Sequence, residues 1–187
     1  MIDRFTMSLG FVFRWECVYA AGHEYDSAFV VSENVPGDGG GVTKWGIDAA
    51  DHPGIDIENL TLEEATTIYH DGEWTAIQGD TLPAGIDTAV FDEAVNTGVR
   101  ESVILLQRAL YGLGYRLAVD GALGPATMAA VVKQAQIDSA GLISQLLAMR
   151  RQYYQEIVAD RPGDAGFLQG WLNRVNDLAA FLKGGAV

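Results

Sequence analysis

The stretch A-F-V-V-S-E-N-V-P-G-D-G-G-G-V-T-K-W-G-I (residues 28–47) decides the fold, because it carries a strand pattern in a chain that otherwise has a helical one. Residues 28–32 and 42–47 are rich in apolar and β-branched side chains, which favour extended backbone. A proline and three consecutive glycines between them predict a wide turn. We therefore expect a small β-hairpin here.

The segments on either side of this hairpin predict helices. Apolar residues recur at helical spacing from residue 3 to residue 19, and Thr61 with Glu64 has the spacing of a capping box. Gly98 is a typical stop for the helix before it, and Pro125 is typical of a first helical turn. The sequence thus predicts a mainly α fold with one small β-hairpin, its helices lying at residues 3–19, 61–70, 84–97, 101–111, from 125 onward, 138–160 and 164–183.

Charge divides the chain of 187 residues into two parts. Residues 1–98 hold 18 acidic and three basic residues, whereas residues 99–187 hold seven acidic and nine basic ones. The net charge of −13 excludes a protein that binds nucleic acid or an anionic membrane over its whole surface.

Several kinds of site are not expected. Cys17 is the only cysteine, which excludes an internal disulfide and a cysteine-based zinc site. The histidines are scattered and the acidic segment at residues 48–58 lacks calcium-loop spacing, so we expect no metal and no cofactor. The N-terminal residues lack the features of a signal peptide and no apolar run reaches about 18 residues, so we expect cytoplasmic synthesis and no membrane span.

Glu16 and the glycine-rich turn are the candidates for chemistry. Cleavage of a glycosidic bond needs a carboxylic acid that protonates the leaving oxygen, and a second polar group that activates water or stabilises charge. A glutamate near a helix end, opposite a hairpin that bears Asp38 and Thr43, supplies both. The alternative is that Glu16 is a solvated helix residue and that the glycines form only a turn.

The motifs around these residues resemble glycoside hydrolase family 108. The family signature pairs E-G-G-Y on a helix with D-P-G-G-x-T-x-x-G-I; here residues 16–19 read E-C-V-Y and residues 38–47 read D-G-G-G-V-T-K-W-G-I. Cys17 and Val18 replace the two glycines, Gly39 replaces the proline, and residues 20–35 lengthen the intervening segment. Two later segments follow in a consistent order: I-E-N-L-T-L-E-E-A-T-T-I-Y (residues 57–69) and L-P-A-G-I-D-T-A-V-F-D-E-A-V-N-T-G (residues 82–98).

This resemblance implies a lysozyme-like α-rich fold and N-acetylmuramidase activity. Carried onto the chain, it implies that Glu16 is the general acid. Asp38 and Thr43 are the candidates for water activation or electrostatic support, and Asp38 is preferred because it lies in the glycine turn. Rival carboxylates lie in the lengthened segment: Glu24, Asp26 and Glu33.

Four further side chains are expected to bind substrate. Tyr19 ends the first motif, and Tyr69, Trp74 and Asn96 lie in or beside the later segments, the last of them in the stretch that also holds Asp92. Aromatic rings stack on sugar rings, and an asparagine amide both donates to and accepts from an N-acetyl group. For Tyr69 and Trp74 the alternative interpretation is packing in the core.

A second motif follows residue 98. L-L-Q-R-A-L-Y-G-L-G-Y-R-L-A-V-D-G-A-L-G-P-A-T (residues 105–127) resembles the repeat of peptidoglycan-binding domains. Its Asp-Gly and Gly-Pro pairs also suit a purely architectural role, that of joining two helices. We therefore divide the chain into a lysozyme-like catalytic lobe at residues 1–98 and a helical, peptidoglycan-binding-like half at residues 99–187.

The resulting prediction is a lysozyme-type peptidoglycan hydrolase that cleaves the β-1,4 bond between N-acetylmuramic acid and N-acetylglucosamine. We expect a monomer whose partner is the glycan strand, and which reaches the cell wall or periplasm through a holin, a secretion system or lysis. Two alternatives stay open: a non-catalytic wall-binding or secretion-accessory protein, and a related hydrolase that acts on a chitin-like glycan.

Overall fold

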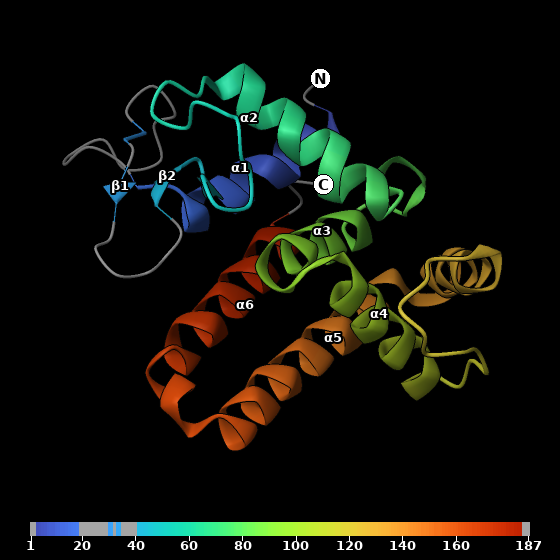
Figure 1. Cartoon of the computed structure of the whole chain (residues 1–187). Coiled ribbons are helices and arrows are strands. Elements are labelled where there is room, and N and C mark those ends of the chain that lie inside the picture. The colour runs from blue at the N-terminus through green and yellow to red at the C-terminus, as the bar shows by residue number, and fades with distance from the viewer. Residues whose placement is uncertain (1–2, 19–29, 32, 35–40, 185–187) are drawn as a thin grey trace. The chain divides into compact units, whose positions relative to one another are not determined.

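The computed structural model describes residues 3–18, 30–31, 33–34 and 41–184 (Figure 1). The chain divides into two compact units. Residues 9–72 form the first, which we call the sheet unit; residues 1–8 together with residues 73–187 form the second, which we call the helical unit. Of the helices in the described part of the chain, none combines the length and the apolar character needed to cross a membrane.

The sheet unit contains a small antiparallel sheet with helical segments beside it. The sheet has the order β1 (Glu33–Asn34), β2 (Val42–Lys44) and β3 (Ile47–Asp48). In its register, Thr43 lies opposite Glu33 on one side and Asp48 on the other. The unit also holds α2 (Leu62–Tyr69) and the C-terminal part of α1 (Arg4–Glu16).

The predicted hairpin is confirmed in kind and differs in detail. The return strand expected over residues 42–47 is interrupted after Lys44 by a tight turn, so that it folds back on itself as β2 and β3. The first strand pairs later than expected, at Glu33 and Asn34, and most of residues 28–32 lies outside the described residues. Thr61 and Glu64 do form the predicted capping box, the backbone N–H of each residue donating to the side chain of the other.

The helical unit consists of helices packed around α3. Its main elements are α3 (Ile86–Thr97), α4 (Val99–Gly112), α5 (Pro125–Asp160) and α6 (Leu168–Lys183), with the short helical turns η3 (Gly79–Thr81) and η4 (Pro162–Gly166). The turn η2 (His70–Trp74) begins in the sheet unit and ends in the helical unit. α5 and α6 run antiparallel and side by side (Figure 1, orange and red). The whole of α3 from Ile86 to Ala94 is buried, which makes this helix the centre of the unit.

The helix boundaries follow the sequence closely. Gly98 ends α3 with φ +91, a backbone conformation that suits glycine, and Pro125 is the first residue of α5. The separate helices expected from residue 125 and over residues 138–160 are continuous in α5 except for a break at Asp138, whose φ is −159 and ψ is 85. Its carboxylate accepts from the Gly141 N–H at 2.8 Å, which caps the second part of α5.

Gln107 holds the Asp-Gly turn of the peptidoglycan-binding-like motif through its side-chain amide. This buried amide donates from Nε2 to Asp120 Oδ1 at 2.9 Å and to the Ala122 carbonyl at 3.0 Å. Its Oε1 accepts from the backbone N–H groups of Asp120 and Gly121, at 3.0 and 2.9 Å. The glutamine of L-Q-R-A-L therefore holds the Asp-Gly turn that leads to α5, which supports the architectural interpretation of these residues.

A buried network of charged side chains joins three helices of the helical unit. Asp92 on α3 accepts from Arg150 Nη1 of α5 at 2.5 Å and from Arg174 Nη2 of α6 at 2.7 Å. Glu93, the next residue on α3, pairs with Arg150 Nε. All four side chains are nearly inaccessible to solvent.

The pKa values of the two carboxyl groups in the network shift in opposite directions. Burial favours a raised pKa for Asp92, but the two guanidinium groups outweigh it and hold the pKa of Asp92 below its ordinary value of 3.8. Burial dominates at Glu93 and raises its pKa despite Arg150. Asp92 is therefore the charged centre of the network at neutral pH.

We predict that Asp92→Ala lowers the free energy of unfolding by about 3–5 kcal/mol at pH 7, because it leaves two buried guanidinium groups without their shared partner. Urea unfolding followed by circular dichroism measures this loss. Asp160→Ala, which removes an exposed carboxylate from the end of α5, is the control and is expected to change stability by less than about 0.5 kcal/mol.

The contribution of Asp92 to stability has a predicted pH dependence. Because the folded-state pKa of Asp92 is depressed, its contribution to stability is fully present above about pH 4 and is lost as the pH falls toward the folded-state value. The acid-induced loss of stability is therefore expected to be shallower in Asp92→Asn than in wild type. An identical acid limb in the two proteins would show that Asp92 is not the group that titrates.

Candidate active site

Glu16 is the last residue of α1 and lies in the sheet unit. Its side chain is half-buried, between Trp15, 36% exposed, and Cys17, which is half-buried. A half-buried carboxyl group at a helix end can reach a bound ligand and donate a proton to it.

The turn between β2 and β3 packs directly against Glu16. Its two central residues, Trp45 and Gly46, have φ of +61 and +75, the positive values that a two-residue type I′ hairpin turn requires. A Cβ atom on Gly46 would lie 2.6 Å from the Cβ of Glu16 and 2.7 Å from the hydroxyl of Tyr69. Gly46 of the T-K-W-G-I motif is therefore required both by backbone conformation and by the close approach of Glu16.

Trp45 is held in its unusual conformation from three directions. A bulky residue rarely adopts positive φ, so the surrounding contacts must favour it. The Trp45 indole is buried and donates from Nε1 to the Leu60 carbonyl at 3.1 Å, and its ring packs on Phe13 of α1 with centroids 5.2 Å apart. The Trp45 carbonyl accepts from the Tyr69 hydroxyl at 2.9 Å. Helix α1, the turn and α2 are thereby locked into one assembly around Glu16.

Of the other two predicted catalytic residues, Thr43 lies within the described residues and Asp38 does not. Thr43 lies on β2, two residues before the turn, and its side chain is half-buried. Asp38 and the substrate-binding candidate Tyr19 lie outside the described residues.

Tyr69 and Trp74 lie in the core. Tyr69 is 4% exposed and its hydroxyl is used by the Trp45 carbonyl, so it positions the turn. Trp74 is 1% exposed, packs on Phe91 in the helical unit and donates from Nε1 to Asp80 at 3.0 Å. For both side chains the burial supports core packing, the alternative interpretation, over stacking on a sugar.

Asn96 belongs to the helical unit, whereas Glu16 belongs to the sheet unit. Asn96 lies near the C-terminus of α3, is half-buried, and accepts from the Tyr154 hydroxyl at 2.5 Å. Asp92 lies four residues earlier, in the segment expected to line a saccharide cleft. Its two carboxylate oxygens instead form ion pairs with Arg150 and Arg174 of the buried network. Sequence reasoning missed this role because the arginine partners lie 58 and 82 positions away.

The comparisons with known proteins agree with this architecture. Residues 30–98 match the family model described as Glycosyl hydrolase 108, and residues 101–176 match the model described as Predicted Peptidoglycan domain. A solved structure titled "Structure of Brucella abortus SagA" superposes with a TM-score of 0.73 at 27% sequence identity, covering 97% of this chain and 95% of that one. No curated protein matches the chain.

Taken together, the fold and these matches support a glycoside hydrolase that acts on peptidoglycan. The resemblance to glycoside hydrolase family 108, with a peptidoglycan-binding-like C-terminal half, is confirmed.

We predict that Gly46→Ala damages both the fold and the site. Alanine disfavours the positive φ of this position, and its methyl group would collide with Glu16 and Tyr69. Gly54→Ala is the matched control: it also has positive φ, +96, but its Cβ would meet nothing within 4 Å. Gly54→Ala should cost about 1 kcal/mol of unfolding free energy, from the backbone conformation alone. Gly46→Ala should cost at least twice as much and should lower the rate of glycan hydrolysis.

Urea unfolding and release of soluble fragments from purified sacculi measure the two effects. An equal loss of unfolding free energy in the two variants would show that the close packing at Gly46 does not contribute to stability.

Proposed function

We propose that the protein is an N-acetylmuramidase that hydrolyses the β-1,4 bond between N-acetylmuramic acid and N-acetylglucosamine, with Glu16 as the general acid. The observation that carries the proposal is the packing of the Trp45–Gly46 turn against Glu16. Gly46 leaves no room for a side chain, and two buried ring contacts and one buried hydrogen bond hold its turn against the carboxylic acid. This fixes the position of the acid more tightly than a solvated helix residue requires.

The reaction needs two groups. The carboxyl proton of Glu16 passes to the glycosidic oxygen as the bond from that oxygen to the anomeric carbon breaks, and the bonding electrons stay with the oxygen. Water then adds to the anomeric carbon and loses a proton to a base. Asp38 and Thr43 are our candidates for assisting this water, and the place of Thr43 on the strand that leads into the Trp45–Gly46 turn favours its part in the site.

The two parts of the chain have complementary proposed roles. We assign bond cleavage to residues 1–98, which hold Glu16 and the acidic excess, and contact with the wall to residues 99–187. The second part carries a slight excess of basic residues, as suits a surface that meets an anionic polymer.

We predict that Glu16→Gln reduces solubilisation of purified sacculi at least a hundredfold, because the amide has no proton to give to the leaving oxygen. Glu63→Gln, an exposed position in the first turn of α2, is the control and should retain wild-type activity. Turbidity of a sacculus suspension is the measurement, with thermal unfolding of both variants to show that the fold is kept. Wild-type clearance by Glu16→Gln would remove Glu16 from the mechanism.

The identity of the new reducing ends tests the bond that is cut. Borohydride reduction followed by mass spectrometry of the fragments should show reduced N-acetylmuramic acid. Reduced N-acetylglucosamine, or cleavage of a chitin oligomer in preference to sacculi, would contradict the muramidase assignment. Binding of sacculi without any release of fragments would favour the non-catalytic accessory protein instead.

A further inference from the structure

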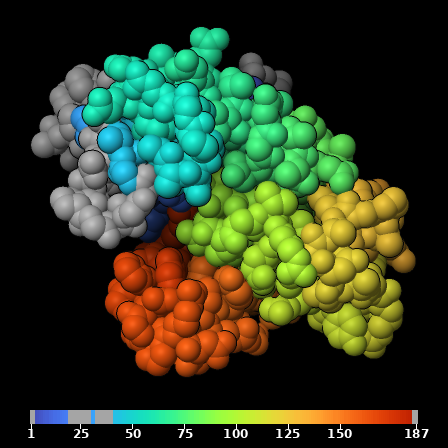
Figure 2. Space-filling model, viewed as in Figure 1, coloured from blue at the N-terminus to red at the C-terminus, as the bar shows by residue number. Residues whose placement is uncertain are grey.

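A hollow in the helical unit has the chemistry of a sugar site. It lies where α5 ends and α6 begins, beside the C-terminal end of α3, and has a volume of about 210 Å³. The turn that joins α5 to α6 lies at the surface of the molecule (Figure 2, orange). The residues that matter here are Asn96, Tyr153, Tyr154, Arg161 and Trp171, and we call this place the aromatic hollow.

A stacked pair of rings lines the aromatic hollow. Trp171 of α6 stacks on Tyr154 of α5, with centroids 5.2 Å apart and an interplanar angle of 30°. Outside the lining, Phe167 just before α6 also stacks on Trp171, at 6.0 Å and 27°, and is 62% exposed. Flat aromatic surfaces of this kind pack against the apolar face of a sugar ring.

The buried charge network orients Asn96 at the base of the aromatic hollow. Arg150 Nε donates to the Tyr154 hydroxyl at 2.8 Å, so this hydroxyl uses its own proton elsewhere. It donates that proton to Asn96 Oδ1 at 2.5 Å, in preference to Glu93 Oε2 at 3.4 Å. The oxygen of the Asn96 amide is therefore occupied, and its NH₂ group makes no hydrogen bond with any described residue.

Other donors surround this amide. The Trp171 indole N–H and the Tyr153 hydroxyl likewise have no hydrogen-bond partner within the part of the chain that the structure describes. The Arg161 side chain is 67% exposed, and among the described residues its guanidinium forms an ion pair with Asp164, at 3.3 Å. The polar groups of the aromatic hollow are thus mostly donors with one cation, a set that suits carbonyl and carboxylate oxygens.

We propose that the aromatic hollow of the helical unit binds a saccharide residue that carries an N-acetyl group and a free carboxylate, as N-acetylmuramic acid does when no peptide is attached to its lactyl group. The identity of the ligand rests on the proposed function. The Asn96 amide would donate to the acetyl carbonyl, Arg161 would pair with the carboxylate, and Trp171 would pack on the ring. A volume of about 210 Å³ is below the roughly 300–1,000 Å³ of pockets that enclose a drug-sized ligand, so one sugar residue fits and a chain passes over it.

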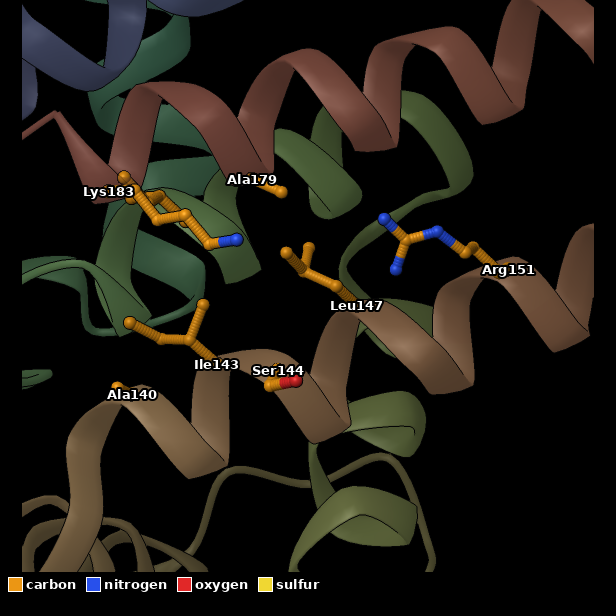
Figure 3. Close-up of a pocket in the computed structure, with 8 residues that line it drawn as sticks. Ala140, Ile143, Ser144, Leu147, Arg151, Ala179 and Lys183 are labelled. Atoms are coloured by element: carbon orange, nitrogen blue, oxygen red, sulfur yellow. The ribbon is translucent and has the colours of Figure 1, made fainter.

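A groove elsewhere between the same two helices lacks this combination. It is lined by Ile143 and Leu147 of α5, with Arg151 and Lys183 pointing toward it from opposite helices (Figure 3). It contains no aromatic side chain, and Arg151 donates to Asn176 at 3.0 Å. The groove therefore provides a control: an arginine on α5 that is not part of the aromatic hollow.

The test measures binding of N-acetylmuramic acid to the full chain by titration calorimetry, with chito-oligosaccharide as the probe that lacks a carboxylate. Trp171→Ala should weaken binding about tenfold, the loss expected for one aromatic stacking contact. Arg161→Ala should weaken binding of N-acetylmuramic acid but not of chito-oligosaccharide. Tyr111→Ala, which removes an aromatic ring that is 51% exposed, and Arg151→Ala should leave both affinities unchanged.

Several results would overturn the proposal. They are unchanged affinity in Trp171→Ala, equal weakening by Arg151→Ala and Arg161→Ala, or no binding of either probe. Because Trp171 touches Tyr154, thermal unfolding must accompany its variant, and the exposed Arg161 provides the arm that does not depend on folding. Repeating the titration in Glu16→Gln separates the two proposals: binding there with no hydrolysis supports both, and wild-type hydrolysis there removes Glu16 while leaving the aromatic hollow in place.

Discussion

The contact between Gly46 and Glu16 is the constraint on which the candidate active site depends. A left-handed two-residue turn brings backbone within van der Waals distance of the acid, and any side chain at Gly46 would occupy the space of Glu16 or Tyr69. Trp45 shares the positive φ and is fixed by its indole, its ring and its carbonyl together. Strain of this kind persists only where the surroundings over-determine it, and such places cluster at functional sites.

The helical unit is organised around a different interaction, the pairing of Asp92 with Arg150 and Arg174. A buried ion network contributes less to net stability than apolar packing of similar volume would, but it specifies how its helices meet. Here the same network extends through the Tyr154 hydroxyl to Asn96. The interior of the unit therefore determines which polar groups face the aromatic hollow, and this links the packing of α3, α5 and α6 to the binding that we propose for them.

The sequence predicts most of the secondary structure, because the signals are local. The Thr61–Glu64 capping box, the glycine at position 98 and the proline at position 125 act within one helical turn of themselves, and the structure confirms each of them. The site is less predictable, because its geometry comes from distant pairs. No local sequence feature distinguishes a tryptophan that stacks on a sugar from one that packs in the core, so only the burial of Trp74 in the structure identifies it as a core residue. The sequence does not predict the turn at residue 45, because residues 42–47 have the pattern of one continuous strand and tryptophan favours strands. The positive φ of Trp45 depends on its contacts with Phe13, Leu60 and Tyr69, which are distant in sequence.

We propose that the fold holds Glu16 in place as a proton donor, and a change of leaving group tests this role. An aryl glycoside of the muramyl sugar releases a phenolate, which leaves without protonation, whereas a glycan strand needs the proton. We expect that Glu16→Gln, compared with wild type, loses hydrolysis of the glycan strand but retains most of its hydrolysis of the aryl glycoside. An equal loss on both substrates would contradict it, since Glu16 would then serve the site in some way other than by giving a proton to the leaving oxygen.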